Sequence, residues 1–298
     1  MGLDRVFKKV RKNKYGFYEL IKKPDGKAQR DNFEEKYYQE CLSGSYEPDY
    51  TGEEIQFREN KILQKEMSWK HIFGEQKIRI LDIGCGEGYF LKHFWEKGQE
   101  VQGIDYSLYA LQKNNPELLP YFIQGDAYEG LKEMADAGKV FDIVNMDSVL
   151  DMMQDPDGLL ELVKGVLARD GVFCCKVANN YSYFQIKLLE ENKLQKEYWL
   201  DPEGHISYFN KDGMLSFFRA HGYECKDIYA EGLAEFFLLN SYSNYYEKPE
   251  TGKECHKAAV YLENMMHGIS SERTHEVMRQ IGHMGLGREL VGLFSLQA

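Results

Sequence analysis

The 298-residue sequence predicts an α/β protein with a doubly wound, mostly parallel seven-stranded sheet, an N-terminal helical cap and an insertion before the last strand. Two observations lead to this prediction. Strand-like runs alternate with helical patterns four times between residues 78 and 177, an order that produces parallel strands joined by right-handed crossovers. The first run, 78–83, is almost continuously apolar, as expected for a strand buried on both faces.

The composition narrows the class of protein. A formal net charge of −11 argues against a surface built for nucleic acid, so we expect a small-molecule partner and no nucleic acid. No apolar run is long enough for a transmembrane helix and no signal peptide is visible, which predicts a cytoplasmic protein. The six cysteines lack metal-ligand spacing, so we expect reduced thiols and no metal. The same lack of spacing holds for the later histidines: His256, His267, His275 and His283.

The first fourteen residues carry apolar side chains at helical spacing among six lysines and arginines. One interpretation is a short helix on an anionic membrane surface. We favour an arm that packs on its own protein or on a second subunit, because the stretch is short for interfacial binding. Residues 15–30 are expected to form a loop. The apolar side chains of the arm are Leu3, Val6, Phe7 and Val10.

A helix is predicted over 53–73, so that residues 1–73 form the N-terminal arm and helical cap. The segment before this helix is rich in tyrosine. The expected apolar side of the helix consists of Ile55, Ile62, Leu63, Met67 and Ile72.

Three glycines at alternate positions, Gly84, Gly86 and Gly88, follow the first strand and open a helix. They allow positive φ angles and let a ligand approach the backbone at a helix N-terminus. A dinucleotide fingerprint would need a third glycine where Tyr89 stands. Asp82, two residues before the first glycine, would repel a pyrophosphate and suits an ammonium-bearing ligand.

This glycine pattern resembles the first motif of the class I S-adenosylmethionine-dependent methyltransferases, which have a Rossmann-like core. The resemblance implies that the loop, Cys85 included, cradles the amino-acid part of the cofactor S-adenosyl-L-methionine. It also implies that the cap folds over the cofactor, with Tyr37, Tyr38 and Arg58 as candidate contacts. For each tyrosine, packing between cap and core is an equally good interpretation.

The next two strands end in further candidate cofactor residues. Strand 99–105 ends at Asp105, about twenty residues beyond the glycine loop, where an acid can hold both ribose hydroxyls, with Tyr106 beside it. The third strand, from Pro120, ends in Gly125-Asp126-Ala127, where the resembled family contacts adenine. The alternative is that Asp126 caps the following helix.

The fourth strand, 140–147, ends in Asp147 and Ser148, which would face the transferred methyl group. It resembles the fourth motif of the family, in which many members continue Leu-Glu-His where this chain has Leu150-Asp151-Met152. The histidine is therefore absent, and no base or metal role is carried over to that position. Asp147 is expected beside the sulfonium, and Asp151 is a weaker candidate.

Beyond the fifth strand, 172–177, residues 179–209 are expected to form substrate loops. His205 is the first candidate for a general base, because an imidazole can remove a hydroxyl proton near neutral pH. The alternative is a loop histidine that hydrogen-bonds the backbone. A helix over 211–221 and a strand over 223–229 are expected to follow.

An insertion over 231–287 is predicted between the sixth strand and a final strand in 288–298, leaving 74–230 as the cofactor-binding core. The last two strands are expected to pair antiparallel, as in the resembled family. Helices are expected over 253–267 and 271–281, serving either substrate recognition or formation of a homodimer. Their expected inward side chains are Ala258, Tyr261, Leu262, Met265 and Ile269, then Val277, Met278 and Ile281.

The predicted function is transfer of a methyl group from S-adenosyl-L-methionine to a hydroxyl of a small molecule, with a sugar or polysaccharide precursor as the preferred acceptor. Asp147 and His205 are the predicted catalytic residues. Three alternatives stay open: a quinone or phenol O-methyltransferase, a nicotinamide-dependent oxidoreductase, and an S-adenosylmethionine-binding protein without catalysis.

Overall fold

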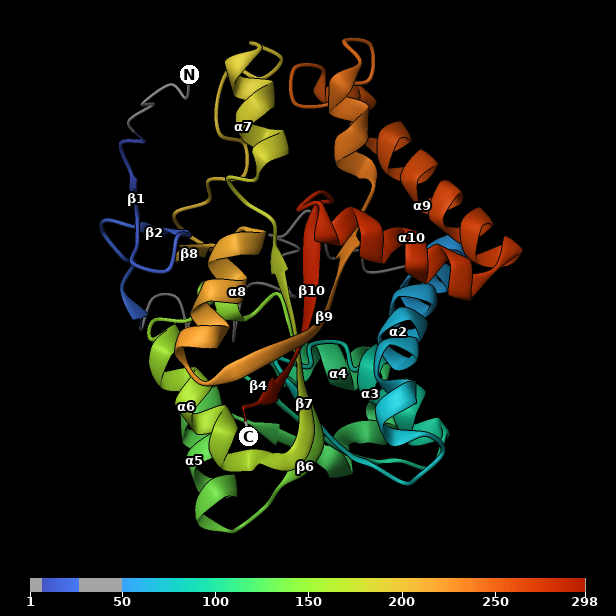
Figure 1. Cartoon of the computed structure of the whole chain (residues 1–298). Helices are drawn as coiled ribbons and strands as arrows, with labels where there is room; N and C mark the ends of the chain where they lie inside the picture. Colours follow the sequence, from blue (N-terminus) through green and yellow to red (C-terminus); the bar gives the residue numbers. More distant parts are fainter. Residues whose placement is uncertain (1–6, 27–49, 298) are drawn as a thin grey trace.

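The computed structural model describes residues 7–26 and 50–297 (Figure 1). Its central sheet contains β3 (Arg79–Ile83), β4 (Glu100–Asp105), β5 (Phe122–Gln124), β6 (Phe141–Asp147), β7 (Leu167–Ala178), β9 (Tyr223–Glu231) and β10 (Glu289–Leu296). The strand order is β5-β4-β3-β6-β7-β10-β9. Strands β5, β4, β3, β6 and β7 pair in parallel, whereas β10 runs antiparallel to both β7 and β9. The predicted fold class and the antiparallel final pair are therefore confirmed.

Helices cover both faces of this sheet. They are α2 (Gly52–Phe73), α3 (Tyr89–Glu96), α4 (Leu108–Asn114), α5 (Ala127–Asp136), α6 (Pro156–Val166), α8 (Lys211–Ala220) and α10 (Ser271–His283). One apolar core joins the sheet to α5, α6 and α8, and a second joins it to α2, α3, α4 and α10 (Figure 1). This leaves the carboxyl ends of the parallel strands as the place where a ligand can enter.

Side-chain caps and tight turns set the ends of the elements around that edge. Thr51 and Glu54 form a reciprocal capping box at the start of α2, and Asp155 caps α6. The third strand is shorter than expected, because its first residues belong to a 3-10 turn, η2 (Pro116–Tyr121). A second 3-10 turn, η3 (Leu150–Met152), follows β6.

A second, small sheet corrects the prediction for the N-terminal region. It consists of β1 (Val10–Lys12), β2 (Tyr18–Leu20) and β8 (Ser207–Tyr208), so the described part of the arm is no helix and 15–30 is not all loop. Pairing of β1 with β2, which itself pairs with β8, outweighs the helical spacing of the arm. Phe7 packs against the rings of Tyr18 and Tyr181, which confirms the preferred interpretation that the arm packs on its own protein. A helix, α7 (Tyr183–Glu190), adds apolar side chains to the same cluster.

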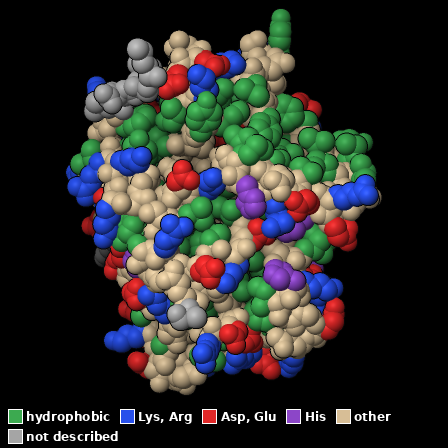
Figure 2. Space-filling model, in the orientation of Figure 1, with side chains coloured by type: hydrophobic (Ala, Val, Ile, Leu, Met, Phe, Trp, Pro, Cys, Tyr) green, Lys and Arg blue, Asp and Glu red, His purple; other side chains and the backbone are tan. Residues whose placement is uncertain are grey.

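The segment between β9 and β10 contains η4 (Ala234–Leu239), η5 (Pro249–Thr251), α9 (Gly252–Ile269) and α10. The expected inward face of α9 is wrong, since all five of its predicted residues are exposed and Val277 of α10 is exposed too. Figure 2 shows hydrophobic side chains gathered over α9 on this side of the molecule. The buried residues of α9 are instead Cys255, Ala259, Val260, Glu263 and His267.

The cap helix α2 departs from its predicted pattern in part, since Ile62 is buried in the apolar core as predicted. Ile55 and Ile72 are exposed, whereas Asn60, Gln64 and Lys65 are buried. In both helices the side turned toward the rest of the protein carries polar groups beside its apolar ones, because part of it borders a charged cavity described below. Within residues 7–26 and 50–297, no helix combines the length and apolar character needed to cross a membrane.

Candidate functional site

Two cavities meet at the carboxyl edge of the parallel strands. The first, which we call the β4 cavity, has a volume of about 500 Å³ and lies where β4, β5 and β6 end. The second, the cap cavity, has a volume of about 650 Å³ and is lined by α2, α9 and the ends of β6, β7, β9 and β10. Gly84, Asp147 and Ser148 line both cavities and therefore mark their junction.

The glycine loop needs its first glycine for two reasons. Gly84 has a φ of 73°, in the left-handed region, and a Cβ at this position would lie 2.3 Å from Cγ2 of Val149. The backbone amide of Gly84 donates to the carbonyl of Ile104 at 2.8 Å, which ties the loop to β4. The Cys85 thiol is buried and packs against Gly103, so only the backbone of Cys85 is suited to contact a ligand.

Carboxylates held by nearby backbone amides line the β4 cavity. Asp105 accepts from the amides of Gly86 at 2.9 Å and Ser107 at 2.8 Å, and burial raises its pKa. Asp126 accepts from the amide of Tyr128 at 2.8 Å, which confirms that it caps α5. Its other carboxylate oxygen accepts from the hydroxyl of Tyr106.

These contacts place four predicted cofactor residues around one cavity: Asp105, Tyr106, Asp126 and Ala127. Asp105 keeps acceptor capacity beyond its bonds to Gly86 and Ser107, since a carboxylate offers about four lone-pair directions. The β4 cavity can therefore hold a group that carries hydroxyls and a flat ring.

Asp82 lies behind the glycine loop and lines the cap cavity. It is buried, and its Oδ1 accepts from Nδ2 of Asn145 at 2.7 Å. Burial, and then the negative charge of Asp147, raise the pKa of Asp82 to about 7. A cation arriving in this cavity would favour the ionised form.

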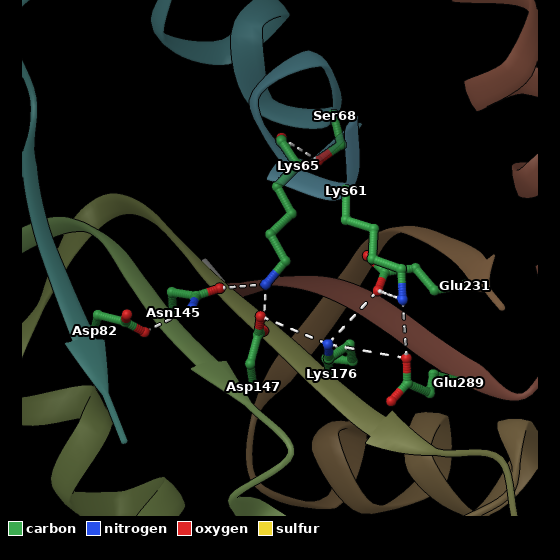
Figure 3. A network of polar contacts seen from close by, with 9 residues as sticks. All are labelled: Lys61, Lys65, Ser68, Asp82, Asn145, Asp147, Lys176, Glu231 and Glu289. Carbon is green, nitrogen blue, oxygen red and sulfur yellow. Dashed lines mark hydrogen bonds and ion pairs between the residues drawn. The ribbon is translucent and has the colours of Figure 1, made fainter. Parts of the chain in front are cut away.

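A lysine from the cap helix reaches the junction of the two cavities (Figure 3). The ammonium of Lys65, fully enclosed on α2, donates to Oδ1 of Asn145 at 2.8 Å and to the carboxylate of Asp147. Burial alone would lower the pKa of Lys65, but the neighbouring acidic groups, Asp147 first and then Cys174 and Glu231, together outweigh it and the pKa is raised. Likewise burial would raise the pKa of Asp147, but Lys65 and Lys176 lower it, so both partners stay charged.

Beyond Asp147 the ion pairs continue across the floor of the cap cavity (Figure 3). Nζ of Lys176 on β7 lies 3.8 Å from Asp147, 3.6 Å from Glu231 on β9 and 3.9 Å from Glu289 on β10. Lys61 of α2 lies 3.6 Å from each of the same two glutamates. Burial would raise the pKa of Glu289, but the two ammonium groups lower it to about 2.

Of the three predicted cap contacts, Arg58 lies at the site, and Tyr37 and Tyr38 fall outside the described residues. The guanidinium of Arg58 lies 3.3 Å from Glu87 of the glycine loop and 4.0 Å from the ring centroid of Tyr50. Arg58 thereby connects the cap to the loop that opens α3.

His205 is placed apart from the predicted cofactor residues. Its Nε2 lies 3.5 Å from Oδ2 of the buried Asp151, and its Nδ1 is buried without a hydrogen-bond partner among the described residues. Asp147 lines both cavities, whereas His205 is absent from the described lining of either. The structure thus pairs two predicted residues, Asp151 and His205, and does not bring them to the junction.

Sequence reasoning missed Lys65, Lys176, Glu231 and Glu289. One signal was available for Lys176, because a lysine inside a buried strand is costly unless a carboxylate pairs with it. The two glutamates stand at the end of β9 and the start of β10, where the register pairs them directly. Within the described part of the chain, no group of three or more His, Cys, Asp or Glu residues is arranged to hold a metal ion.

Comparison with known proteins identifies the family of this chain. A family model described as "Methyltransferase domain" matches residues 56–227. A protein named as a ribosomal RNA large subunit methyltransferase of Methanocaldococcus jannaschii is 34% identical over 105 residues, which cover 33% of this chain and 26% of that protein. A ubiquinone biosynthesis O-methyltransferase of Ruegeria pomeroyi is 26% identical over 158 residues, covering 50% of this chain and 61% of the relative. The matches thus span between a quarter and about three fifths of these relatives.

A solved structure supports the fold over nearly the whole chain. The 1,6-didemethyltoxoflavin-N1-methyltransferase of Burkholderia thailandensis, solved with 1,6-didemethyltoxoflavin and S-adenosylhomocysteine, superposes with a TM-score of 0.52. The match covers 97% of this chain and 100% of the other at 13% identity, so it shows a shared fold.

Proposed function

Because this chain belongs to the class I S-adenosylmethionine-dependent methyltransferases, we propose that it transfers the methyl group of S-adenosylmethionine to a hydroxyl of a small polar acceptor. The observation that carries this proposal is the junction of the two cavities at Gly84, Asp147 and Ser148. A donor and an acceptor can meet there when one occupies each side.

In this proposal the nucleoside part of the donor lies in the β4 cavity. Asp105 holds the ribose hydroxyls, and Asp126 with the backbone of Ala127 contacts the adenine, next to Tyr106. The methionine part follows the glycine loop into the cap cavity, where Asp82 suits its ammonium. These assignments direct the methyl group toward Asp147.

The acceptor occupies the cap cavity, whose charged walls favour a molecule with many polar groups, such as a sugar or a polysaccharide precursor. An apolar quinone ring would leave several of these buried charges without a hydrogen-bonding ligand, at a cost in free energy. A quinone or phenol is the second candidate, because a similar protein is named as a ubiquinone biosynthesis O-methyltransferase. The net charge of −11 disfavours an RNA acceptor.

Methyl transfer needs alignment and one proton acceptor. The acceptor oxygen forms a bond to the methyl carbon while the carbon–sulfur bond breaks, its electrons stay on sulfur, and the hydroxyl proton passes to a base. Asp147 is the charged group at the junction and can accept a hydrogen bond from the reacting hydroxyl. His205 is the alternative base, and Asp151 would stabilise its protonated form.

Calorimetry and turnover test the proposal. We expect S-adenosylmethionine and S-adenosylhomocysteine to bind and NAD not to bind. Labelled S-adenosylmethionine should then pass its methyl group to one of a panel of nucleotide sugars. Binding of NAD alone would overturn the proposal. Binding of the donor with no turnover on sugars or phenols would point to a protein without catalysis. Undiminished turnover in His205→Ala would remove that base and leave Asp147.

A further inference from the structure

Glu231 is a buried carboxylate that lines the cap cavity without a hydrogen bond. Its side chain is 1% exposed, and neither carboxylate oxygen has a hydrogen-bond partner within the described part of the chain. The nearest cations, Lys61 and Lys176, are each 3.6 Å away, beyond the usual hydrogen-bond distance of about 2.7–3.2 Å. A buried acceptor left in this state is costly unless a ligand satisfies it.

Glu289 is a second carboxylate beside Glu231 in the cap cavity. It lies directly opposite Glu231 in the antiparallel register of β9 and β10, and Lys61 and Lys176 each contact both glutamates. The four contacts range from 3.6 to 3.9 Å, so two carboxylates alternate with two ammonium groups at distances longer than direct hydrogen bonds (Figure 3). The arrangement has hydrogen-bonding capacity left over for a ligand.

The alternation of carboxylates and ammonium groups indicates which chemical groups the ligand carries. A hydroxyl group donates one hydrogen bond and accepts others, so it can bridge a carboxylate and an ammonium group. The charges of these two carboxylates and two ammonium groups balance one another, so the four groups by themselves favour neither an anion nor a cation. Neighbouring hydroxyls on one molecule therefore match the pattern better than a phosphate, an amine or an apolar ring.

The position of the pair connects it to the reacting centre. Lys176 contacts Asp147 at the junction on one side and Glu231 on the other. A molecule with one hydroxyl at Asp147 thus extends its next groups toward the two glutamates. We propose that Glu231 and Glu289 bind a second hydroxyl of the acceptor, adjacent to the one that is methylated, so that the enzyme selects vicinal diols.

This proposal rests on the proposed function. It is tested by a cycle in which a hydroxyl of the acceptor and the side chain of Glu231 are removed singly and together. Initial rates are measured with labelled S-adenosylmethionine and a panel of nucleotide hexoses, each beside the deoxy sugar that lacks one hydroxyl. In the unmodified protein, removing the adjacent hydroxyl should raise KM about tenfold, and Glu231→Gln should raise KM for the full acceptor by a similar factor. With both changes together, no further loss is expected, because the lost contact is the same one.

Glu235→Gln is the matched control. Glu235 is equally buried and follows β9, but it bonds to Gln185 and Tyr198 and does not line either cavity. Affinity for S-adenosylhomocysteine, measured by calorimetry, should stay unchanged in Glu231→Gln and Glu289→Gln, which also shows that the variants fold.

Different outcomes would overturn the selection of diols and the transfer of a methyl group. Fully independent effects of the deoxy acceptor and Glu231→Gln, or a best acceptor with a single hydroxyl, would overturn the diol proposal. Turnover only on phenols with a single hydroxyl, and on no sugar, would overturn it as well and leave methyl transfer standing. Failure to bind S-adenosylmethionine at all would overturn the proposed function itself.

Discussion

The two cavities are built in different ways. In the β4 cavity, Asp105 and Asp126 bond to amides within three residues or to the neighbouring glycine loop, and no lysine or arginine is among the described lining residues. In the cap cavity, charged side chains bond to partners far away in the sequence, as Lys65 does to Asp147 and Lys176 does to Glu289.

The difference separates what local sequence encodes from what only the assembled fold creates. A turn and its capping acid form wherever the same few residues occur together. An ion pair between α2 and β6 exists only after the helix has docked on the sheet. We therefore expect changes in the β4 cavity to alter donor affinity, and changes at the ion pairs between α2 and the strands to alter stability and acceptor use.

The largest effect should come from breaking the contact between cap and sheet. Lys65→Met leaves the charge of Asp147 without its main partner, and we expect a loss of about 3 kcal/mol in the free energy of unfolding, measured with urea. Lys70→Met on the same helix is the control. Its exposed contact to Glu75 should contribute less than about 0.5 kcal/mol. A double variant, Lys65→Met with Asp147→Asn, should lose less than the sum, and additive losses would contradict the pairing.

Gly84→Ala should weaken binding of the methyl donor. The added Cβ meets Val149 and forces a positive φ on alanine, so we expect affinity for S-adenosylmethionine to fall roughly 100-fold by calorimetry. Gly138→Ala provides the comparison, because Gly138 also has a positive φ (67°) but has open space around it. That control should cost about 1 kcal/mol of stability and leave donor affinity unchanged. Equal donor affinities in the two variants would contradict the role of the loop.

The two roles of Asp126 can be separated by replacing it with alanine and with serine. Alanine removes the helix cap and should cost about 1 kcal/mol of stability, whereas serine keeps a capping oxygen and should cost little. Both variants should weaken binding of S-adenosylhomocysteine about tenfold, since both remove the carboxylate. If serine restored full affinity, Asp126 would act only as a cap.

The smallest effect should be a pH dependence of donor binding. Burial raises the pKa of Asp82 to about 7, so the folded protein holds a proton that the unfolded chain releases near pH 4. The resulting stability is therefore complete below about pH 4 and is lost as the pH rises through 7. Because the ammonium of the donor favours the ionised carboxylate, affinity for S-adenosylhomocysteine should rise several-fold between about pH 6 and pH 8. Asp82→Asn should flatten this rise, and an unchanged slope would exclude Asp82 as its source.

The parts predicted well were those with a local cause. The alternation of strands and helices and the apolar run before Gly84 predicted the parallel part of the sheet, and Asp105 followed from its place at the end of a strand. The resemblance to the methyltransferase family added Asp126 and Ala127 and the antiparallel final pair. The register that brings Glu231 opposite Glu289 depends on pairing between strands almost sixty residues apart, for which no local pattern exists.

The helices over the site were misread for a related reason. The apolar residues of α2 and α9 were assumed to face inward, but Lys65 and Glu263 face inward while Ile55 and Ile269 are exposed. Hydrophobic periodicity predicts the buried side of a helix when its neighbour is an apolar core. Over part of α2 and α9 the neighbour is a charged cavity, and there the rule gave the wrong residues.

The position of Lys65 also affects how fast the enzyme can exchange its donor. For α2 to move away from the sheet, the ammonium of Lys65 must leave both Asn145 and Asp147, its two partners in a buried setting. Such separations are infrequent because they are costly. We expect the exchange of spent donor for fresh donor to be slower than methyl transfer itself, so a single turnover on preloaded enzyme should outpace steady-state turnover.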